Sequence, residues 1–324
     1  HILGMGRSFR TRQLKHAIQT DKPYMTLYGR LSGEPEITLG VRRLRAQREL
    51  ELRLKGDKNA RLAELVEAMP LQLINPDAFR LLEGSPAGRR EFLDWGVFHV
   101  KHDFLAIWKR TRRALKHRNA LLRRGRIQPQ EMVVWEQELA TWGEQMDTLR
   151  RAWFSDFLPV FEETLKVLLP LPGLSLHYAR GWDKDRSLAA VLHDSRPTDQ
   201  QMGFTQQGPQ RADLRIRINK QPAVEVLSRG QQKLVVSALK LAQGRFLERT
   251  AQRHCIYLID DLPAELDEQN RYQFCGLLED MQCQAFITSV EPSTLKNAWR
   301  TDTPVKMFHV KHGKEGLSDL EKAD

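Results

Sequence analysis

Apolar and polar residues alternate in three short segments near the start of the chain. These segments are Met25–Tyr28, Glu36–Leu39 and Leu50–Leu54. A period of two residues is typical of strands with one solvent-facing side, so the sequence predicts antiparallel strands here. A short helix is predicted over Leu62–Ala68, ending before Pro70, and a buried strand over Leu71–Ile74.

The apolar period changes from two residues to three or four between Pro86 and about Pro170. This period indicates helices with one buried face. The residues from Gly125 to Pro129 interrupt it, so the sequence predicts two long helices that pack as an antiparallel hairpin. Most aromatic side chains of this region are predicted to be packing residues.

Strands and helices alternate after Pro172. Strands are expected over Leu174–Tyr178, Ala212–Ile218, Cys255–Ile259 and Gln284–Ser289, and helices over Leu188–His193, Arg229–Thr250 and Glu268–Met281. This alternation indicates a parallel α/β layer. A last edge strand is expected over Val305–Val310, followed by a charged tail.

Positive charge is clustered rather than spread along the 324 residues, whose net charge is +10. Ten bases and one acid, Asp103, lie between Lys101 and Arg126, and a second cluster between Arg42 and Arg61 is diluted by acids. Such a surface attracts polyanions, of which nucleic acid is the commonest in the cytoplasm, although a solvated helix face that binds nothing is the alternative. The predicted DNA-binding residues are Arg110, Arg112, Arg113, Lys116, Arg123 and Arg124.

The three cysteines, Cys255, Cys275 and Cys283, have no spacing typical of metal ligands. Their odd number argues against a disulfide framework, which favours a reducing cytoplasm. No apolar run reaches the ~18 residues that a membrane span needs. We therefore expect a cytoplasmic protein with no membrane partner.

Two carboxylates, Asp260 and Asp261, follow the apolar strand Cys255–Ile259. This is the Walker B arrangement, in which a dry strand delivers an acid to the carboxyl edge of the sheet. Asp260 would orient Mg²⁺ and Asp261 would polarise the attacking water, which makes both candidate catalytic residues. The alternative is that an Asp at a strand end caps the next helix.

The segment Leu262–Asp267 has the form of the D-loop of ABC-type ATPases, a turn that crosses to the opposing subunit. Asp267 could instead cap the helix that begins at Glu268, and it could do both.

The run Leu227–Leu234 opens a long helix and matches the ABC signature, in which Ser228, Arg229, Gly230 and Gln231 would bind ATP held by a partner subunit. Ser228 caps the helix, Gly230 permits close approach of the backbone, and the helix N-terminus favours a phosphate. A plain Ser-capped helix would not call for the Gly230–Gln231 pair. The signature followed by Walker B about 25 residues later is typical of an ABC-type ATPase.

A phosphate loop of the form Gly-x-x-x-x-Gly-Lys-[Ser/Thr] is absent from the sequence. Gly313-Lys314 is followed by Glu315 and lies at the wrong end. We expect the loop to precede His1, because Ile2-Leu3-Gly4 reads as the tail of the helix that follows such a loop. The 324 residues would then carry half of a nucleotide site, and we expect them to be inactive as an ATPase alone.

The chain resembles the RecF family of bacterial recombination mediators, ABC-type ATPases with an SMC-like head. The resemblance covers nearly the whole chain, and three of its segments are Leu3–Arg10, Gly84–Asp94 and Gly208–Leu214. The family usually has His where this chain has Gln210, which puts a proton-linked role there in doubt. Thr288-Ser289 stands where transporter ATPases carry a switch His, which argues against a transporter subunit.

The resemblance implies ATP and Mg²⁺ as cofactors, a homodimer formed around ATP on DNA, and the RecO and RecR proteins as partners. It implies a role in gap repair, replication restart and the SOS response to DNA damage, with recombinase loading as the outcome and a weak, DNA-stimulated ATPase. Gln72 is a candidate Q-loop residue, and the preferred alternative is an ordinary strand residue.

The expected fold is an α/β ABC-type ATPase head, with a parallel core sheet and an antiparallel β subdomain, plus a helical-hairpin arm. Residues 1–85 and 171–324 would form the head, and residues 86–170 the arm. A non-enzymatic DNA-binding or interaction remnant without its own ATP site is the alternative function. The coding sequence upstream of His1 distinguishes the two, since a phosphate loop there would exclude the remnant.

Overall fold

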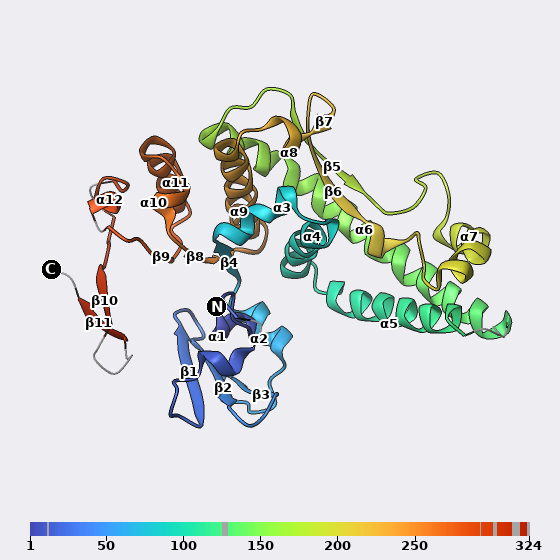
Figure 1. The fold of residues 1–324 in the computed structure, drawn as a ribbon, viewed down its shortest axis with the longest axis horizontal. Coiled ribbons are helices and arrows are strands. Elements are labelled where there is room, and N and C mark those ends of the chain that lie inside the picture. Colours follow the sequence, from blue (N-terminus) through green and yellow to red (C-terminus); the bar gives the residue numbers. More distant parts are fainter. Residues whose placement is uncertain (12, 125–128, 292, 301–302, 313–317, 323–324) are drawn as a thin grey trace.

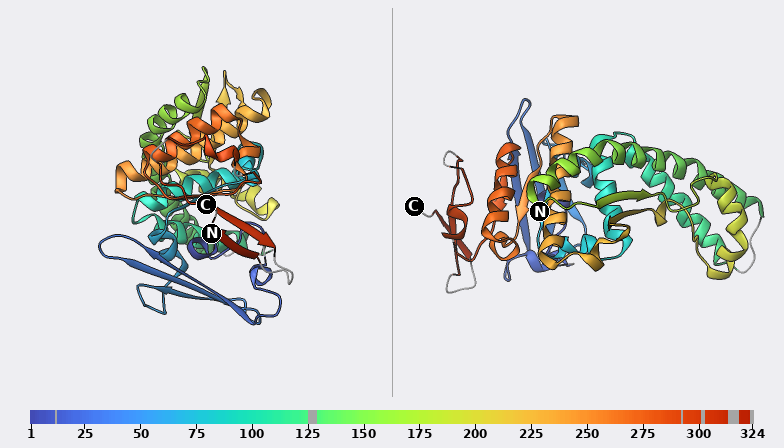
Figure 2. Two further views of the ribbon diagram at one scale, coloured as in Figure 1. Left: turned by 90° about the vertical axis from the view of Figure 1, so that its left-hand side faces the viewer. Right: turned by 90° about the horizontal axis from the view of Figure 1, so that it is seen from above.

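The computed structural model describes residues 1–11, 13–124, 129–291, 293–300, 303–312 and 318–322. A layered body carries a small antiparallel lobe on one side and a long helical arm at one end (Figure 1). Seen from above, the arm and the C-terminal hairpin lie at opposite ends of the molecule (Figure 2).

The N-terminal lobe is built on β1 (Tyr24–Leu31), β2 (Ile37–Leu44) and β3 (Leu50–Leu54). These strands pair antiparallel in the order β1-β2-β3, which confirms the prediction from their period. The helices α1 (Ile2–Met5) and α2 (Leu62–Ala68) pack against the sheet. They close a small apolar core that includes Leu39, Val41 and Leu65.

A parallel sheet lies at the centre of the body. It contains β4 (Leu71–Ile74), β8 (Ile256–Ile259) and β9 (Ala285–Ile287) in the order β4-β8-β9. Ile74 is in register with Ile259, and Ile259 with Ile287, so the three strands end at one edge. The helix α9 (Arg229–Ala251) packs against β4, and α11 (Glu268–Asp280) packs against α9.

The parallel layer is smaller than we predicted from the sequence. The strands β5 (Leu174–Ala179), β6 (Asp213–Ile218) and β7 (Gln221–Pro222) form a separate antiparallel sheet. In β6 the buried Leu214, Ile216 and Ile218 alternate with more exposed residues. That one-sided pattern is typical of antiparallel strands, whereas parallel strands are buried on both faces.

The C-terminal strand also differs from the prediction. Instead of an edge strand of the core sheet over 305–310, β10 (Phe308–His312) pairs antiparallel with β11 (Ser318–Lys322) in a sheet of their own. Part of the expected charged tail therefore lies in a strand. A two-residue period predicts a strand but not its partner, because pairing depends on how the chain folds back.

The arm is a helical hairpin of α5 (Phe104–Leu122) and α6 (Pro129–Leu168) (Figure 1). The helix α7 (Leu188–Met202) packs against α6. The predicted hairpin is confirmed, but the first helix is broken, because α4 (Pro86–Val100) ends before α5 begins. Proline and glycine are absent from residues 101–103, so the break carries no local breaker signal.

The main core joins α4, the C-terminal half of α6, α9 and the strands of the body. Trp153 and Phe157 stack with their ring centroids 4.5 Å apart, and both lie edge-on to Phe246. This confirms that most aromatics of the helical region are packing residues. The division into head and arm at residues 85 and 170 stays a prediction. The helix α4, which lies within the predicted arm, shares the core of the body, and α7, which lies within the predicted head, packs on the arm.

His99 is buried near the end of α4 and lies against Trp95, with 4.3 Å between the ring centroids. Neither of its ring nitrogens has a hydrogen-bond partner among the residues that the structure describes. Burial, with a smaller effect from the positive charge of Arg253, lowers the pKa of His99 from 6.5 to about 3. The imidazole is therefore held neutral in the fold.

We predict that His99 makes folding stability depend on pH. Between pH 6.5 and 3 the unfolded chain binds a proton at this residue and the folded chain does not, so stability falls as the pH decreases through this window. At pH 5 the loss should be about 2 kcal/mol. Urea unfolding at pH 7.5 and pH 5 measures it. His99→Leu should remove this difference and His102→Leu, at an exposed histidine, should keep it; equal pH dependence in all three proteins would contradict the prediction.

Candidate nucleotide and nucleic-acid sites

Asp260 stands at the carboxyl edge of the parallel sheet. Its backbone N–H donates to the carbonyl of Ile74, 2.8 Å away, which ties it to the end of β4. The Thr288 hydroxyl, just past β9, donates to Asp260 Oδ1 at 2.9 Å and accepts from the Asp261 N–H at 2.9 Å. Thr288 therefore fixes the carboxylate of one acid and the backbone of the next.

Asp261 has a left-handed backbone, with φ of 53°. This conformation costs a residue other than glycine about 1–2 kcal/mol, so its neighbours must hold it. Although Asp261 precedes α10 (Leu262–Glu265), its side chain makes no capping hydrogen bond. Helix capping, the alternative explanation for an acid at this strand end, does not account for Asp261.

Asp267 is an exposed helix cap in this structure. Its carboxylate accepts from the backbone N–H of Asn270 at 2.9 Å and from the side-chain amide of Asn270 at 2.7 Å, which begins α11. The capping role is confirmed. A contact across a subunit interface stays a prediction.

The signature residues form an exposed helix N-terminus. Ser228 Oγ accepts from the N–H of Gln231 at 3.3 Å, and Gln231 Oε1 accepts from the N–H of Ser228 at 3.0 Å. This capping box explains Gln231 by helix capping alone. The expectation that a plain Ser-capped helix does not call for the Gly230–Gln231 pair was therefore wrong for Gln231.

Gly230 is not explained in the same way. Its φ is not positive, and a Cβ added there would meet nothing within 4 Å. Glycine within a helix costs about 0.5–1 kcal/mol relative to alanine. Neither conformation nor packing within the described residues requires glycine, so the open surface in front of Gly230 is the feature that suits the close approach of another molecule.

The signature helix is joined to the D-loop segment by an ion pair. Lys233 Nζ lies 2.8 Å from Glu265 Oε2, and both side chains are largely removed from solvent. Arg229, at the first position of α9, pairs with Glu83 of α3 (Arg80–Glu83). These contacts hold the N-terminus of α9 against the body.

Gln72 lies inside β4 and is 2% exposed. Its amide donates to Gln243 Oε1 at 2.9 Å, and the Gln243 amide donates to the carbonyl of Phe92 at 2.7 Å. The side chain is therefore engaged in the protein interior. This placement favours an ordinary strand residue over a Q-loop residue.

The bases of α5 divide by their surroundings. Arg118 is fully buried and bonded to Glu136 and Asp199, so this member of the cluster is structural. Arg123 donates to the carbonyl of Gly203, and Arg124 lies 4.0 Å from Glu131. Arg126 is outside the described residues.

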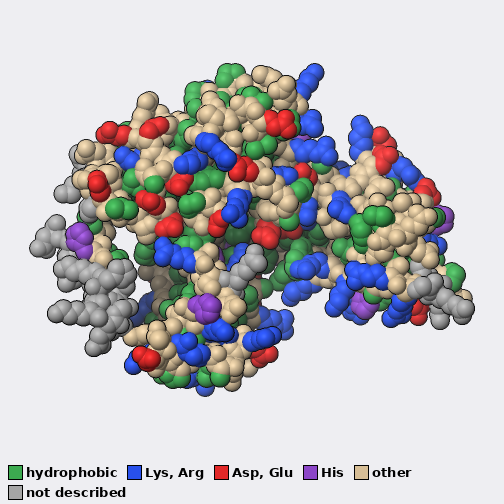
Figure 3. Space-filling model, viewed as in Figure 1, with side chains coloured by type: hydrophobic (Ala, Val, Ile, Leu, Met, Phe, Trp, Pro, Cys, Tyr) green, Lys and Arg blue, Asp and Glu red, His purple; other side chains and the backbone are tan. Residues whose placement is uncertain are grey.

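The remaining predicted DNA-binding bases are exposed and form no ion pair with the described residues. Within the described ranges, no carboxylate lies within 4.0 Å of Arg110, Arg112, Arg113 or Lys116. Lys and Arg side chains gather along the edge of the arm where α5 lies (Figure 3). The second cluster is partly structural, because Arg43 is buried and Arg45 donates to the carbonyls of Ile18, Gln19, Thr20 and Lys22.

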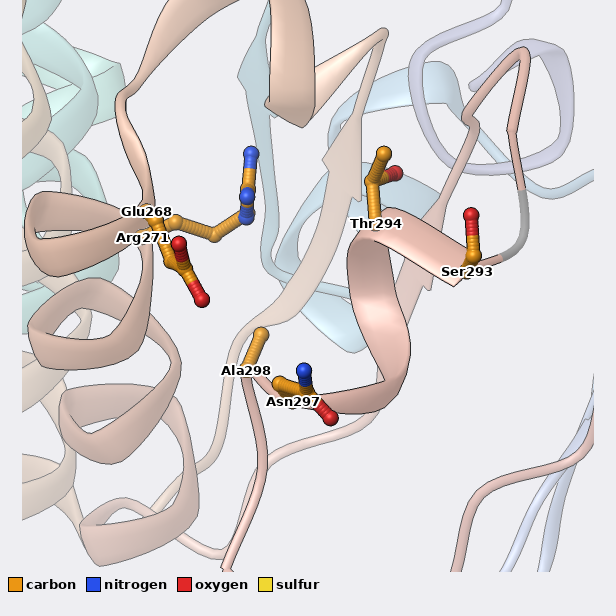
Figure 4. A pocket seen from close by; sticks show the side chains of 6 residues that line it. All are labelled: Glu268, Arg271, Ser293, Thr294, Asn297 and Ala298. Atoms are coloured by element: carbon orange, nitrogen blue, oxygen red, sulfur yellow. The ribbon is translucent and has the colours of Figure 1, made fainter.

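Two surface pockets lie near the D-loop segment and Asp260. The first, of about 240 Å³, lies between α11 and α12 (Ser293–Lys296) and is lined by Arg271, Thr294 and Asn297 among others (Figure 4). Arg271 also donates to the carbonyl of Leu266 in the D-loop segment. The second, of about 380 Å³, includes Phe9, Arg10 and Tyr28, and Arg10 reaches to 3.9 Å from Asp260.

Three features of these sites are not predicted by the sequence motifs. They are the bridge made by Thr288, the approach of Arg10 to Asp260, and the contacts between tryptophans and the bases of α5. In the described part of the chain, His, Cys, Asp and Glu side chains form no group of three that could hold a metal ion. The same residues include no helix both long and apolar enough to cross a membrane.

Comparisons with known proteins show what the chain as a whole is similar to. Residues 1–316 match the RecF/RecN/SMC N terminal domain. The chain is 65% identical over 314 residues to the DNA replication and repair protein RecF of Chromohalobacter salexigens, a match that covers 97% of this chain and 87% of the relative. The RecF protein of Pseudomonas aeruginosa is 53% identical over 316 residues, covering 97% of this chain and 85% of the relative.

Solved structures share the fold at low sequence identity. The recombination mediator protein RecF solved with ATP superposes with a TM-score of 0.82 at 20% identity, covering 99% of this chain and 86% of that one. An Smc head bound to the C-terminal winged-helix domain of ScpA gives a TM-score of 0.51 at 15% identity, covering 93% and 75%. The expected fold, an ABC-type head of the RecF and SMC type with a helical arm, is confirmed.

Proposed function

Because this chain belongs to the RecF family, we propose that it is an ATP-controlled DNA-binding protein that acts as a recombination mediator in gap repair and replication restart. One observation carries the DNA-binding part of this proposal. The exposed half of α5 bears Arg110, Arg112, Arg113 and Lys116 with no carboxylate within 4.0 Å in the described part of the chain. Unpaired cations on one helix attract a polyanion strongly.

Backbone phosphates are the partners that suit this surface. Guanidinium and ammonium groups bind phosphate oxygens whatever the base sequence, and each contact releases a counterion. The helix α5 itself contains no Asp or Glu to compete with those phosphates. A DNA duplex, with two charges per base pair, presents a dense array of such phosphates.

The nucleotide part of the proposal draws on the signature residues. Ser228 and Gly230 are exposed at the N-terminus of a 23-residue helix, where free N–H groups and the helix dipole favour a phosphate. A surface that faces outward suits ATP held by a second copy, so we propose a homodimer that closes around ATP. Lys233 and Glu265 would keep the signature and the D-loop segment in one unit at that interface.

The carboxyl edge of the sheet offers one ligand that suits magnesium, the carboxylate of Asp260. Asp260 keeps a quarter of its side chain exposed and is oriented by Thr288, which suits an Mg²⁺ ion held through water by one carboxylate and by phosphates. The ion would neutralise the charge of the phosphates when bound. Asp261, with a carboxylate free of capping bonds, would orient the attacking water.

We also propose the RecR and RecO proteins as partners and the cytoplasm as the location. The cysteines agree with a reducing compartment. Cys255, Cys275 and Cys283 are all free thiols, and burial raises the pKa of Cys275 to about 12, which keeps it protonated and unreactive.

Binding of a labelled DNA duplex across a salt series tests the proposal. If four to six phosphates are neutralised, the affinity should fall by about two to three orders of magnitude between 50 and 200 mM salt. Sedimentation with and without ATP and Mg²⁺ tests the dimer and uses a form that carries a phosphate loop, because no such loop occurs within the 324 residues. A salt-independent affinity would exclude the DNA clamp, and a mass unchanged by ATP would exclude the nucleotide-dependent dimer.

A further inference from the structure

Three tryptophans of the arm each lie beneath an arginine. The guanidinium carbon of Arg110 is 4.2 Å from the ring centroid of Trp142, that of Arg112 is 4.6 Å from Trp108, and that of Arg113 is 5.9 Å from Trp135. Trp135 also stacks in parallel with His117, at 4.1 Å between centroids.

Trp135 and Trp142 come from α6 and reach across the hairpin to α5. They are seven residues apart, which is two helical turns or about 10 Å along the axis, so both project toward the same neighbour. Trp108 and Arg112, in contrast, are one turn apart on α5 itself. The contacts of Arg110 and Arg113 are therefore made by the packing of the two helices.

An indole ring holds a guanidinium without neutralising it. The ring face attracts the flat cation by about 0.5–1 kcal/mol at an exposed site, while the N–H groups at the edge of the guanidinium remain free to donate. A carboxylate would occupy those donors. An unrestrained arginine would instead lose up to about 2 kcal/mol of side-chain entropy when it is fixed on a ligand.

We propose that Trp135 and Trp142 are positioning residues that hold Arg113 and Arg110 ready for the phosphates of a DNA duplex. The inference depends on the proposed DNA-binding function and assigns a role within it. Since the guanidinium groups lie over these indole rings, the rings position the arginine side chains and do not stack with DNA bases. The arm should then recognise backbone phosphates, independent of sequence.

The test compares variants of the full 324-residue chain by anisotropy of a labelled duplex. Trp142→Leu and Trp135→Leu should each weaken binding about two- to fivefold, which corresponds to about 0.5–1 kcal/mol. Trp142→Phe keeps a ring face but loses the indole N–H bond to Glu138, and it should retain most of the affinity. The salt dependence should be unchanged in all three variants, because every charge remains.

Arg110→Lys provides a second measurement that leaves the apolar packing intact. It keeps the charge but not the flat guanidinium, so it should weaken binding as much as Trp142→Leu. The double variant that combines Arg110→Lys with Trp142→Leu should bind the duplex no more weakly than either single variant, since both changes remove the same interaction.

Several outcomes would overturn the proposal. Wild-type affinity in Trp142→Leu and Trp135→Leu would do so, as would additive losses in the double variant. If Trp142→Leu and Trp135→Leu bind a single-stranded oligonucleotide more weakly than the wild-type chain but bind the duplex with unchanged affinity, the rings stack with bases. If the wild-type chain itself shows no salt-dependent binding, the proposed function fails instead, so the two failures are distinguishable.

Discussion

Replacing Arg110, Arg113 and Lys116 together with glutamate should lower the affinity for a DNA duplex by about 100-fold. Each exposed contact contributes up to about 1 kcal/mol, and three such changes amount to about two orders of magnitude. The three side chains are exposed and have no carboxylate partner in the described structure, so the change breaks no internal ion pair. The salt dependence should also decrease, by about one unit of log–log slope per lost phosphate contact.

A matched control separates local contact from overall charge. Lys166, Arg215 and Lys220 are exposed bases at the far end of α6 and on and just after β6. Their replacement by glutamate changes the net charge by the same amount as the α5 variant. If both triple variants lose equal affinity, α5 is not the DNA-binding surface and attraction by net charge is the explanation.

Replacing Arg118 with alanine should destabilise the protein by about 3–5 kcal/mol, the loss typical of breaking a buried ion pair. The guanidinium is fully buried between α5, α6 and α7. It donates to Glu136, Asp199, the Thr205 hydroxyl and the carbonyl of Leu192, so all five of its N–H groups are satisfied.

The loss is large because the partners stay behind. Without Arg118, Asp199 would remain fully buried with no cation within 4.0 Å in the described part of the chain, and Glu136 would keep its pair with Arg196. Urea unfolding of Arg118→Ala and Arg112→Ala measures the difference, because Arg112 is exposed on the same helix and has no carboxylate partner in the described ranges. A loss below about 1 kcal/mol in Arg118→Ala would show that the arm tolerates the unpaired acids.

Much of the fold could be predicted because its signals are local. The helix Leu62–Ala68 and the strand Leu71–Ile74 have the predicted bounds, since an apolar period followed by a proline is legible in a few residues. The same holds for Ser228 and Asp267, whose capping bonds join residues three apart. The break between α4 and α5 was missed because no local breaker marks it.

The candidate site was predicted as a set of strand and helix ends, without its internal contacts. Asp260 and Asp261 followed from an apolar strand that ends in acids. The bridge made by Thr288 could not be predicted, because it depends on β9 lying beside β8. Gln72 shows the same limit, since its partner Gln243 is 171 positions away.

The sequence by itself determined most of the elements, the caps and the motifs, because periodicity and capping act over a few residues. It also determined that α5 is basic. Only the tertiary structure decided what each base does: Arg113 and Arg118 are the same residue type, five positions apart on one helix. Arg118 turns toward Glu136 and Asp199 and is buried, whereas Arg113 lies over Trp135 with its donors free of any carboxylate among the described residues. The difference is physical, because burial and pairing depend on which helices pack against each face of α5.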